Sequence, residues 1–181
     1  MALKSTIFKA DLQIADMDRQ YYDGHGLTIA RHPSETDERM MVRILAFVLH
    51  AHEALSFGKG LSTDDEPDLW QKDLTGAIEL WIDVGQPDEK RIMKACGRSN
   101  QVMIYSYSSM SNIWWNQIAS KVDRAKNLSV FNLPAATSQA LAKLAQRSMQ
   151  LQCTIQDGQV WINGEGAVSY THLRAHETGR N

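Results

Sequence analysis

The apolar residues of this 181-residue chain follow two different periods, and this change of period limits the fold more than any other feature. Residues 5–16 and 25–32 alternate between apolar and polar side chains, which is typical of half-buried strands. Residues 40–48 instead repeat their apolar side chains every third or fourth position, which is typical of an amphipathic helix. A chain that mixes both patterns is neither all-helical nor all-strand.

Turn and capping residues divide the rest of the chain into elements. Residues 23–24, 73–76 and 157–158 predict hairpin turns, and Ser34 with Asp37 predicts the capped start of the first helix. The later elements are strands at 55–61, 101–107 and 127–133 and helices at 88–98, 113–123 and 137–149. Their order predicts an α/β fold in which helices flank a mixed sheet.

Composition sets the class of protein. A hydrophobic content of 43% and a charged content of 22% are ordinary for a globular protein, and we expect residues 1–167 to form a single domain. Residues 168–181 read VSYTHLRAHETGRN, which resembles a translated cloning or sequencing linker. We therefore leave this tail out of the fold prediction.

Charge and cysteine content limit the partners and the compartment. A formal net charge of −2 means that any contact with nucleic acid must use a local basic patch. The two cysteines match no metal-ligand spacing, which indicates reduced thiols in a cytoplasmic protein. Neither a signal peptide nor an 18-residue apolar run occurs, so we expect no membrane association. A protein partner and the oligomeric state stay open.

Residues 66–85, EPDLWQKDLTGAIELWIDVG, place acids inside an apolar stretch. Asp68 lies in the first arm of the predicted hairpin, residues 67–73, and Glu79 and Asp83 lie in the second arm. A buried carboxylate is costly unless its charge is compensated, and Mg²⁺ or Mn²⁺ prefers carboxylate oxygens. Two alternatives stay open: residues 64–68 form a solvated acidic loop, or Glu79 and Trp81 lie on an exposed strand face.

The order αβββαβ, from the first helix to residue 107, resembles the catalytic core of the PD-(D/E)XK nuclease superfamily. The matching motifs are Pro67-Asp68 and Asp83-Val84-Gly85. The resemblance implies a restriction-endonuclease-like core with extra N- and C-terminal hairpins. It also implies a bound Mg²⁺ or Mn²⁺ that activates water against a phosphodiester.

The lysine that normally completes this motif is replaced by Gly85. The following helix offers substitutes, of which Lys94 is preferred and Lys90 is second; Arg91 and Arg98 are the others. The resemblance implies that Asp68, Asp83 and Lys94 are catalytic. The predicted metal ligands are Asp68, Glu79, Asp83 and Glu38, with Glu35 behind Glu38.

Longer stretches carry a closer resemblance. IARHPSETDERMM, GLSTDDEPDLW and IELWIDVGQPDEKRIMKAC are similar to the YaeQ family, and the likeness covers most of residues 1–165. It implies a compact variant of the PD-(D/E)XK fold. Two functions are expected from it: a metal-dependent phosphodiesterase or nuclease, or a catalytically degenerate adaptor that binds nucleic acid or protein.

Overall fold

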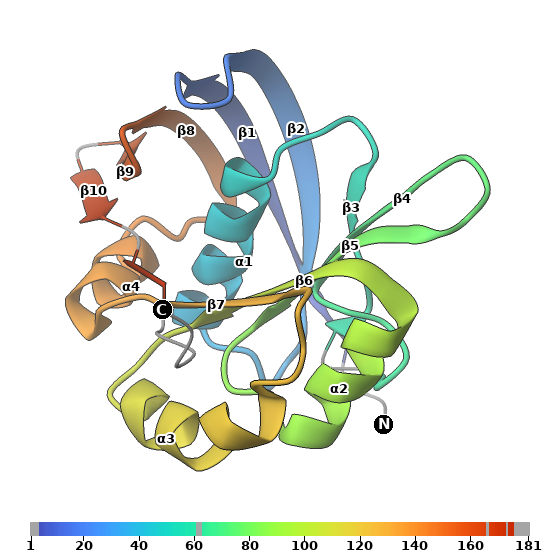
Figure 1. The fold of residues 1–181 in the computed structure, drawn as a ribbon. Coiled ribbons are helices and arrows are strands. Elements are labelled where there is room, and N and C mark those ends of the chain that lie inside the picture. Colours follow the sequence, from blue (N-terminus) through green and yellow to red (C-terminus); the bar gives the residue numbers. More distant parts are fainter. Residues whose placement is uncertain (1–3, 61–62, 166, 173, 176–181) are drawn as a thin grey trace. The chain divides into compact units, whose positions relative to one another are not determined.

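The chain forms two compact units, each with its own mixed sheet. Unit 1 comprises Met1–Leu49 and Ala136–Leu173, and unit 2 comprises His50–Ala135 and Arg174–Asn181. The computed structural model describes residues 4–60, 63–165, 167–172 and 174–175. Over these residues it has four helices and two mixed sheets (Figure 1). The predicted α/β fold with mixed strand pairing is confirmed, but the strands divide between two sheets instead of one.

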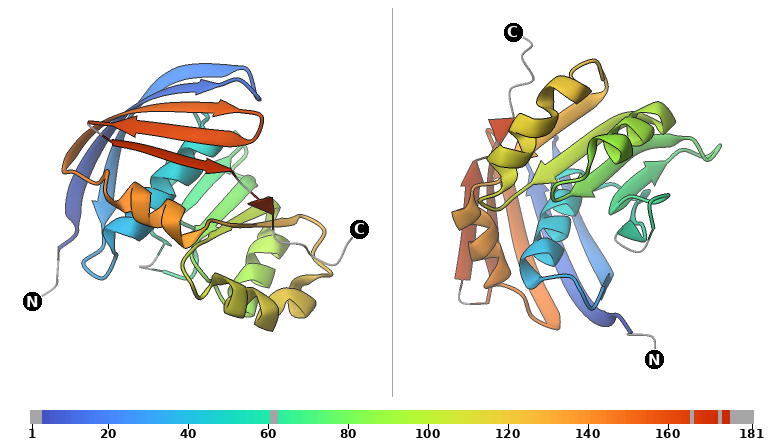
Figure 2. Two further views of the ribbon diagram at one scale, coloured as in Figure 1. Left: turned by 90° about the vertical axis from the view of Figure 1, so that its left-hand side faces the viewer. Right: turned by 90° about the horizontal axis from the view of Figure 1, so that it is seen from below.

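The sheet of unit 1 has the strand order β10-β9-β8-β1-β2. Its strands are β1 (Thr6–Asp16), β2 (Tyr21–Arg31), β8 (Ser148–Gln156), β9 (Gln159–Gly164) and β10 (Ala167–His172). Both predicted terminal hairpins are present, because β2 pairs antiparallel with β1 and β9 pairs antiparallel with β8. The two hairpins join through a parallel pairing of β1 with β8, so the orange and red strands run beside the blue ones (Figure 2).

The first hairpin turns earlier than the sequence predicted. Asp16 accepts a hydrogen bond from the backbone N of Arg19 at 3.0 Å, and Gln20 takes a positive φ of 53°. This local bond reverses the chain before residue 21, and the predicted turn at 23–24 is wrong. Gly24 and Gly26 consequently lie inside β2, opposite Gln13 and Asp11 of β1.

Two helices belong to the segments on either side of the inserted unit. Helix α1 (Asp37–Leu49) is capped by the preceding Thr36, whose Oγ1 accepts from the backbone N of Arg39 at 3.1 Å. Ser34, the predicted cap, bonds His32 instead. Phe47 of α1 contacts the ring of His25 edge-on, which places α1 against one face of the five-stranded sheet. Helix α4 (Ala135–Ala142) ends earlier than predicted, and the last two residues of the predicted helix, Ser148 and Met149, begin β8.

The sheet of unit 2 has the order β11-β7-β6-β5-β4-β3. Its strands are β3 (Leu55–Phe57), β4 (Leu69–Lys72), β5 (Ile78–Val84), β6 (Ser99–Ser106), β7 (Leu128–Asn132) and β11 (Arg174–Ala175). Strands β5, β6 and β7 are mutually parallel, and β3 and β4 add antiparallel pairs at one edge. The predicted run of three strands, a helix and a strand is therefore present in this unit.

Helices α2 (Glu89–Arg98) and α3 (Ser111–Val122) pack against the sheet of unit 2 and complete its apolar core. Trp81 of β5 packs in one apolar cluster with Ile92 of α2 and Trp115 of α3. Because strand side chains alternate between faces, Asp83 lies on the same face of β5 as Trp81. This strand and its helix-covered face position the candidate site.

The described residues of the predicted tail form strand β10 in unit 1 and the two-residue strand β11 in unit 2. The cloning origin of residues 168–181, and a single domain over 1–167, stay predictions. No helix among the described residues has the length and apolar character that crossing a membrane requires.

Candidate functional site

Asp68 and Asp83 lie side by side on neighbouring strands of unit 2. The register pairs Leu69 with Ile82, so Asp68, which directly precedes β4, stands opposite Asp83. The backbone N of Asp68 lies 3.4 Å from Oδ1 of Asp83, and the backbone N of Val84 donates to Oδ2 of Asp68 at 2.8 Å. Each aspartate is only 3% exposed. The alternative of a solvated loop is therefore wrong for Asp68, although it fits Asp64, whose side chain is 98% exposed.

Two glycines allow a loop to close over Asp68. The backbone N of Gly58 donates to the Asp68 carbonyl at 3.0 Å, and that of Gly60 donates to the Pro67 carbonyl at 3.1 Å. A Cβ atom at Gly60 would lie 2.4 Å from Oδ1 of Asp68, and a Cβ at Gly58 would lie 2.3 Å from the Pro67 carbonyl. Any side chain at either position would push this loop away, so the glycines keep Asp68 buried.

Arg91 holds Asp83 through two hydrogen bonds. Asp88 caps α2 and accepts from the backbone N of Arg91, which places the arginine in the first turn of that helix. Its Nε donates to Oδ2 of Asp83 at 2.9 Å, and its Nη2 lies 3.2 Å from Oδ1. Nε1 of Trp81 also donates to Oδ2, at 3.1 Å. The exposed strand face considered for Trp81 is therefore wrong, since Trp81 is buried and bonds this carboxylate.

Arg91 also fixes the acidic loop that precedes β4. Its Nη2 donates to the Glu66 carbonyl at 2.9 Å, and its Nη1 donates to the Thr63 carbonyl at 3.3 Å. Partial burial lowers the pKa of Arg91, but the hydrogen bond and charge of Asp83, together with the charges of Asp68 and Asp64, outweigh that effect and raise it. The guanidinium therefore stays charged within the field of three carboxylates.

The preferred lysine lies elsewhere. Nζ of Lys94 contacts Oδ1 of Asp65 at 3.2 Å, and its side chain is 53% exposed. Arg98, one turn further, donates to the Asp65 carbonyl. A catalytic role for Lys94 stays a prediction, and the helical cation that contacts Asp83 is Arg91. The sequence places both Lys90 and Arg91 in the first turn of the helix after the capping Asp88, and it gives no signal that selects Arg91 between them.

The backbone at Gly85 explains why no lysine stands there. Its φ is +102°, a conformation that L-amino acids rarely adopt, and its N donates to the Tyr105 carbonyl at 2.9 Å. A Cβ at this position would meet no atom within 4 Å. Space is therefore available for a side chain, and the conformation of the chain at the end of β5 is what excludes one.

The remaining predicted ligands, Glu79 and Glu38, have other hydrogen-bond partners. Glu79 accepts from Nε2 of Gln71 at 3.0 Å, and its four-residue separation from Asp83 corresponds to about 13 Å along the strand. Glu38 belongs to unit 1, where it accepts from Ser138 Oγ at 3.1 Å. Metal ligation by either residue stays a prediction. Over the residues that the structure describes, no cluster of three or more His, Cys, Asp or Glu side chains suited to a metal occurs.

Known proteins resemble the chain over nearly its whole length. A protein described as uncharacterized protein YaeQ from Salmonella typhi is 48% identical over 164 residues, which cover 90% of this chain and 91% of the relative. The corresponding protein of Escherichia coli K12 is 46% identical over 166 residues, covering 91% and 92%.

Solved structures agree with these sequence relatives. The crystal structure of the YaeQ protein from Xanthomonas axonopodis pv. citri superposes with a TM-score of 0.92 at 47% identity, covering 96% of this chain and 98% of the other. The YaeQ protein of Pseudomonas syringae gives a TM-score of 0.91 at 36% identity, covering 97% and 98%. The family model for the YaeQ protein matches residues 1–172. The chain therefore belongs to the YaeQ family.

Proposed function

We propose that the chain is a variant PD-(D/E)XK phosphodiesterase of the cytoplasm that acts on nucleic acid with Mg²⁺ or Mn²⁺. The observation that carries this proposal is that two buried aspartates, Asp68 and Asp83, lie opposite each other on neighbouring chain segments, with the backbone N of Asp68 3.4 Å from Oδ1 of Asp83. Mg²⁺ is usually held by one or two protein carboxylates, with water completing the coordination. The pair is therefore sufficient without Glu79 or Glu38.

The charges around the pair suit a divalent cation. Arg91 contributes one positive charge and interacts with Asp83, Asp68 and Asp64. Additional positive charge would reduce the repulsion among these three carboxylates. When bound, the ion would polarise the phosphoryl oxygen and lower the pKa of a water molecule.

Arg91 supplies the phosphate contact in this proposal. A planar guanidinium matches the two oxygens of a phosphate in the same way as it matches those of Asp83. Arg91 would move from Asp83 to the substrate when another cation compensates the carboxylate. Because its pKa is raised, Arg91 stabilises negative charge and does not transfer protons. Lys94 and Arg98, exposed on the same helix, would attract the polyanion.

Calorimetric titration with Mn²⁺ tests the site without a choice of substrate. We expect the wild-type chain to bind Mn²⁺, and we expect Asp68→Asn and Asp83→Asn each to weaken binding at least tenfold. Glu79→Gln and Glu38→Gln should bind Mn²⁺ as the wild type does if the pair alone is sufficient. Asp65→Asn is the control for a general loss of charge, because Asp65 is exposed and contacts Lys94.

Hydrolysis is then tested on DNA and RNA substrates with Mg²⁺ or Mn²⁺. Asp83→Asn should abolish cutting, and Arg91→Lys should reduce it because lysine lacks the planar fork. Lys94→Ala decides whether the predicted lysine takes part, since loss of cutting with normal Mn²⁺ affinity would assign it a catalytic role. If the wild-type chain binds no Mn²⁺, the phosphodiesterase proposal fails.

A second candidate is a catalytically degenerate adaptor, and the saturation of Asp83 favours it. The two oxygens of this carboxylate accept from four donors: Asp68 N, Trp81 Nε1, and Nε and Nη2 of Arg91. The adaptor would bind nucleic acid with a salt-dependent affinity and without cutting. A role in protein binding alone predicts neither Mn²⁺ binding nor affinity for nucleic acid.

A further inference from the structure

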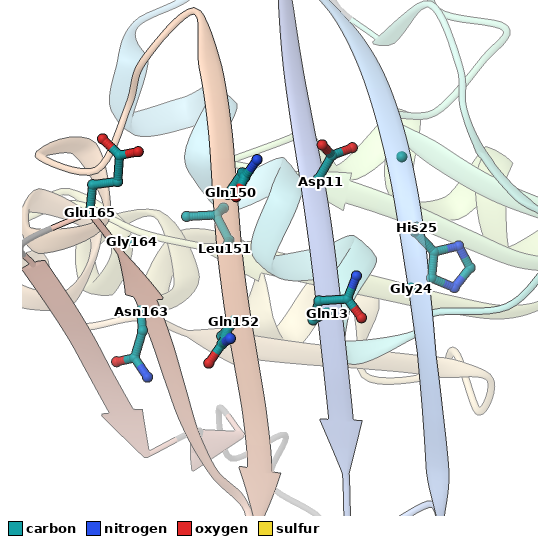
Figure 3. Close-up of a pocket in the computed structure, with 11 residues that line it drawn as sticks. Asp11, Gln13, Gly24, His25, Gln150, Leu151, Gln152, Asn163, Gly164 and Glu165 are labelled. Atoms are coloured by element: carbon teal, nitrogen blue, oxygen red, sulfur yellow. The ribbon is translucent and has the colours of Figure 1, made fainter.

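One face of the sheet in unit 1 carries two rows of polar side chains. The strand registers align Gly24, Gln13, Gln152 and Asn163 across β2, β1, β8 and β9. The row beside it begins with Gly26, Asp11 and Gln150 and continues to Glu165 just beyond β9. Figure 3 shows these side chains at corresponding levels of adjacent strands. Together the six polar side chains line a hollow of about 610 Å³, which we name the amide groove.

Glycines keep the amide groove open on the β2 side. A Cβ at Gly24 would lie 3.0 Å from Nε2 of Gln13, and a Cβ at Gly26 would lie 3.4 Å from Oδ1 of Asp11. A side chain at position 24 or 26 would therefore displace the side chain of Gln13 or Asp11 and fill this part of the groove. A second hollow of about 400 Å³ continues along the strands and shares Gln13, Gly24 and Gln152 with the first. The groove is therefore elongated.

The polar groups of the groove are available to a ligand. The side chains of Gln13, Gln150, Gln152 and Asn163 form no hydrogen bond with any other residue that the structure describes. Each amide offers two N–H donors and one carbonyl acceptor in a single plane. Such groups match a ligand that presents several hydroxyls, because each hydroxyl both donates and accepts.

Charge and one aromatic ring narrow the ligand further. Neither lysine nor arginine is among the described residues that line the two hollows, and Asp11, Asp23 and Glu165 are acidic, so an anion is disfavoured. Tyr22 lines the second hollow and is 63% exposed, which provides an apolar ring face at one end of the groove. We propose that the amide groove binds a neutral oligosaccharide, with its hydroxyls on the amides and one sugar ring on Tyr22.

The experiment is a titration of the ¹⁵N-labelled full chain with neutral trisaccharides, namely maltotriose, cellotriose and tri-N-acetylchitotriose. We expect at least one of them to shift the side-chain amide signals of the groove, which single Gln→Ala variants assign. Gln13→Ala and Gln152→Ala should each weaken binding about fivefold, the loss expected for one hydrogen bond. Gln156→Ala is the matched control, because Gln156 is exposed on the same strand as Gln152 and lines neither hollow.

Three results would overturn the proposal. The first is that no trisaccharide shifts the amide signals at millimolar concentration. The second is that the double variant Gln13→Ala/Gln152→Ala, shown by circular dichroism to be folded, binds the sugar as tightly as the wild type. The third is that spermidine, a linear polycation, shifts these signals while the sugars do not, since that result would show that the groove binds cations through its carboxylates. Normal sugar affinity in Asp83→Asn would show that the groove is independent of the site in unit 2.

Discussion

The Asp68–Asp83 site of unit 2 and the amide groove of unit 1 are both polar, but they use their polar groups in opposite ways. In the site, Asp83 accepts from Trp81, Arg91 and the backbone, and the acids are buried. In the groove, the amides face solvent and bond no described residue. We therefore expect the residues of the site to stabilise the fold, and we expect the amides of the groove to contribute little to its stability.

The largest effect should come from Asp83→Ala. It leaves the partly buried Arg91 without its carboxylate, and we expect the free energy of unfolding to fall by about 3 kcal/mol, measured by urea denaturation. Glu79→Ala is the matched control on the same strand and should cost less than about 1 kcal/mol, because Glu79 is only half-buried and accepts one hydrogen bond from Gln71. Equal losses in the two variants would contradict our account of the site.

Two glycine-to-alanine substitutions should change the free energy of unfolding in opposite directions. Gly85→Ala forces a side chain into a φ of +102° and should cost about 1–2 kcal/mol, although space is available. Gly97→Ala, within α2 and equally open, should stabilise the chain by about 0.5 kcal/mol, because alanine loses less conformational freedom in a helix. Urea denaturation of both variants measures the difference. A neutral Gly85→Ala would show that the backbone does not exclude lysine there.

Asp73 is an exposed acid that, unlike the amides of the groove, accepts hydrogen bonds from neighbouring residues. Its Oδ1 accepts from the hydroxyl and backbone N of Thr75 and from the backbone N of Ala77. The hydroxyl bond of Thr75 is the largest cause that lowers the pKa of Asp73 in the folded chain, so ionised Asp73 stabilises the fold above its ordinary pKa of about 3.9. This stabilisation is lost as the pH falls through the lowered folded pKa.

We therefore expect Asp73→Asn to melt slightly below the wild type at pH 7. The gap in Tm should narrow as the pH falls from about 3.9 through the lowered folded pKa, because Asp73 of the folded wild type becomes protonated over that range. Thermal unfolding followed by circular dichroism at a series of pH values measures this. A gap that is constant from pH 7 to pH 2 would mean that the charge of Asp73 has no part in the turn.

The smallest effect should come from the groove. Gln13→Ala/Gln152→Ala removes two exposed amides that bond no described residue, so the free energy of unfolding should change by less than about 0.5 kcal/mol. Urea denaturation beside the Asp83→Ala variant gives the comparison directly. A loss above about 1 kcal/mol would show that these amides support the sheet, and the contrast between the two regions would disappear.

Much of the fold was predictable because its signals are local. Period-2 alternation identified β1, and the turn residues Asp73–Gly76 and Asp157-Gly158 located two hairpins. The errors also have local causes. Asp16 bonds Arg19 and turns the first hairpin early, and Thr36 caps α1 in place of Ser34, which bonds His32. Such choices depend on competing short-range hydrogen bonds that residue type alone does not rank.

The site was predictable only in part. Acids within apolar segments indicated Asp68 and Asp83, and the strand register then brings them together. Arg91 was one of four helical cations, and its selection depends on the rotation of α2 over the sheet, which sequence does not specify. The groove was missed because it depends on a parallel pairing of β1 with β8. A signal was present in the alternating DLQ of residues 11–13 and QLQ of residues 150–152.

The parallel pairing of β1 with β8 also affects the order in which the chain can fold during synthesis. Lys9 aligns with Ser148, so the first hairpin gains its neighbour only after nearly the whole chain has been synthesised. At typical translation rates of about 5–20 residues per second, this delay is on the order of ten seconds. Meanwhile one edge of β1 has unpaired N–H and C=O groups that another nascent chain could recruit. Residues 50–135 lie between the two segments of unit 1 in the sequence and can fold during this interval. We therefore expect unit 2 to begin folding before unit 1 during synthesis.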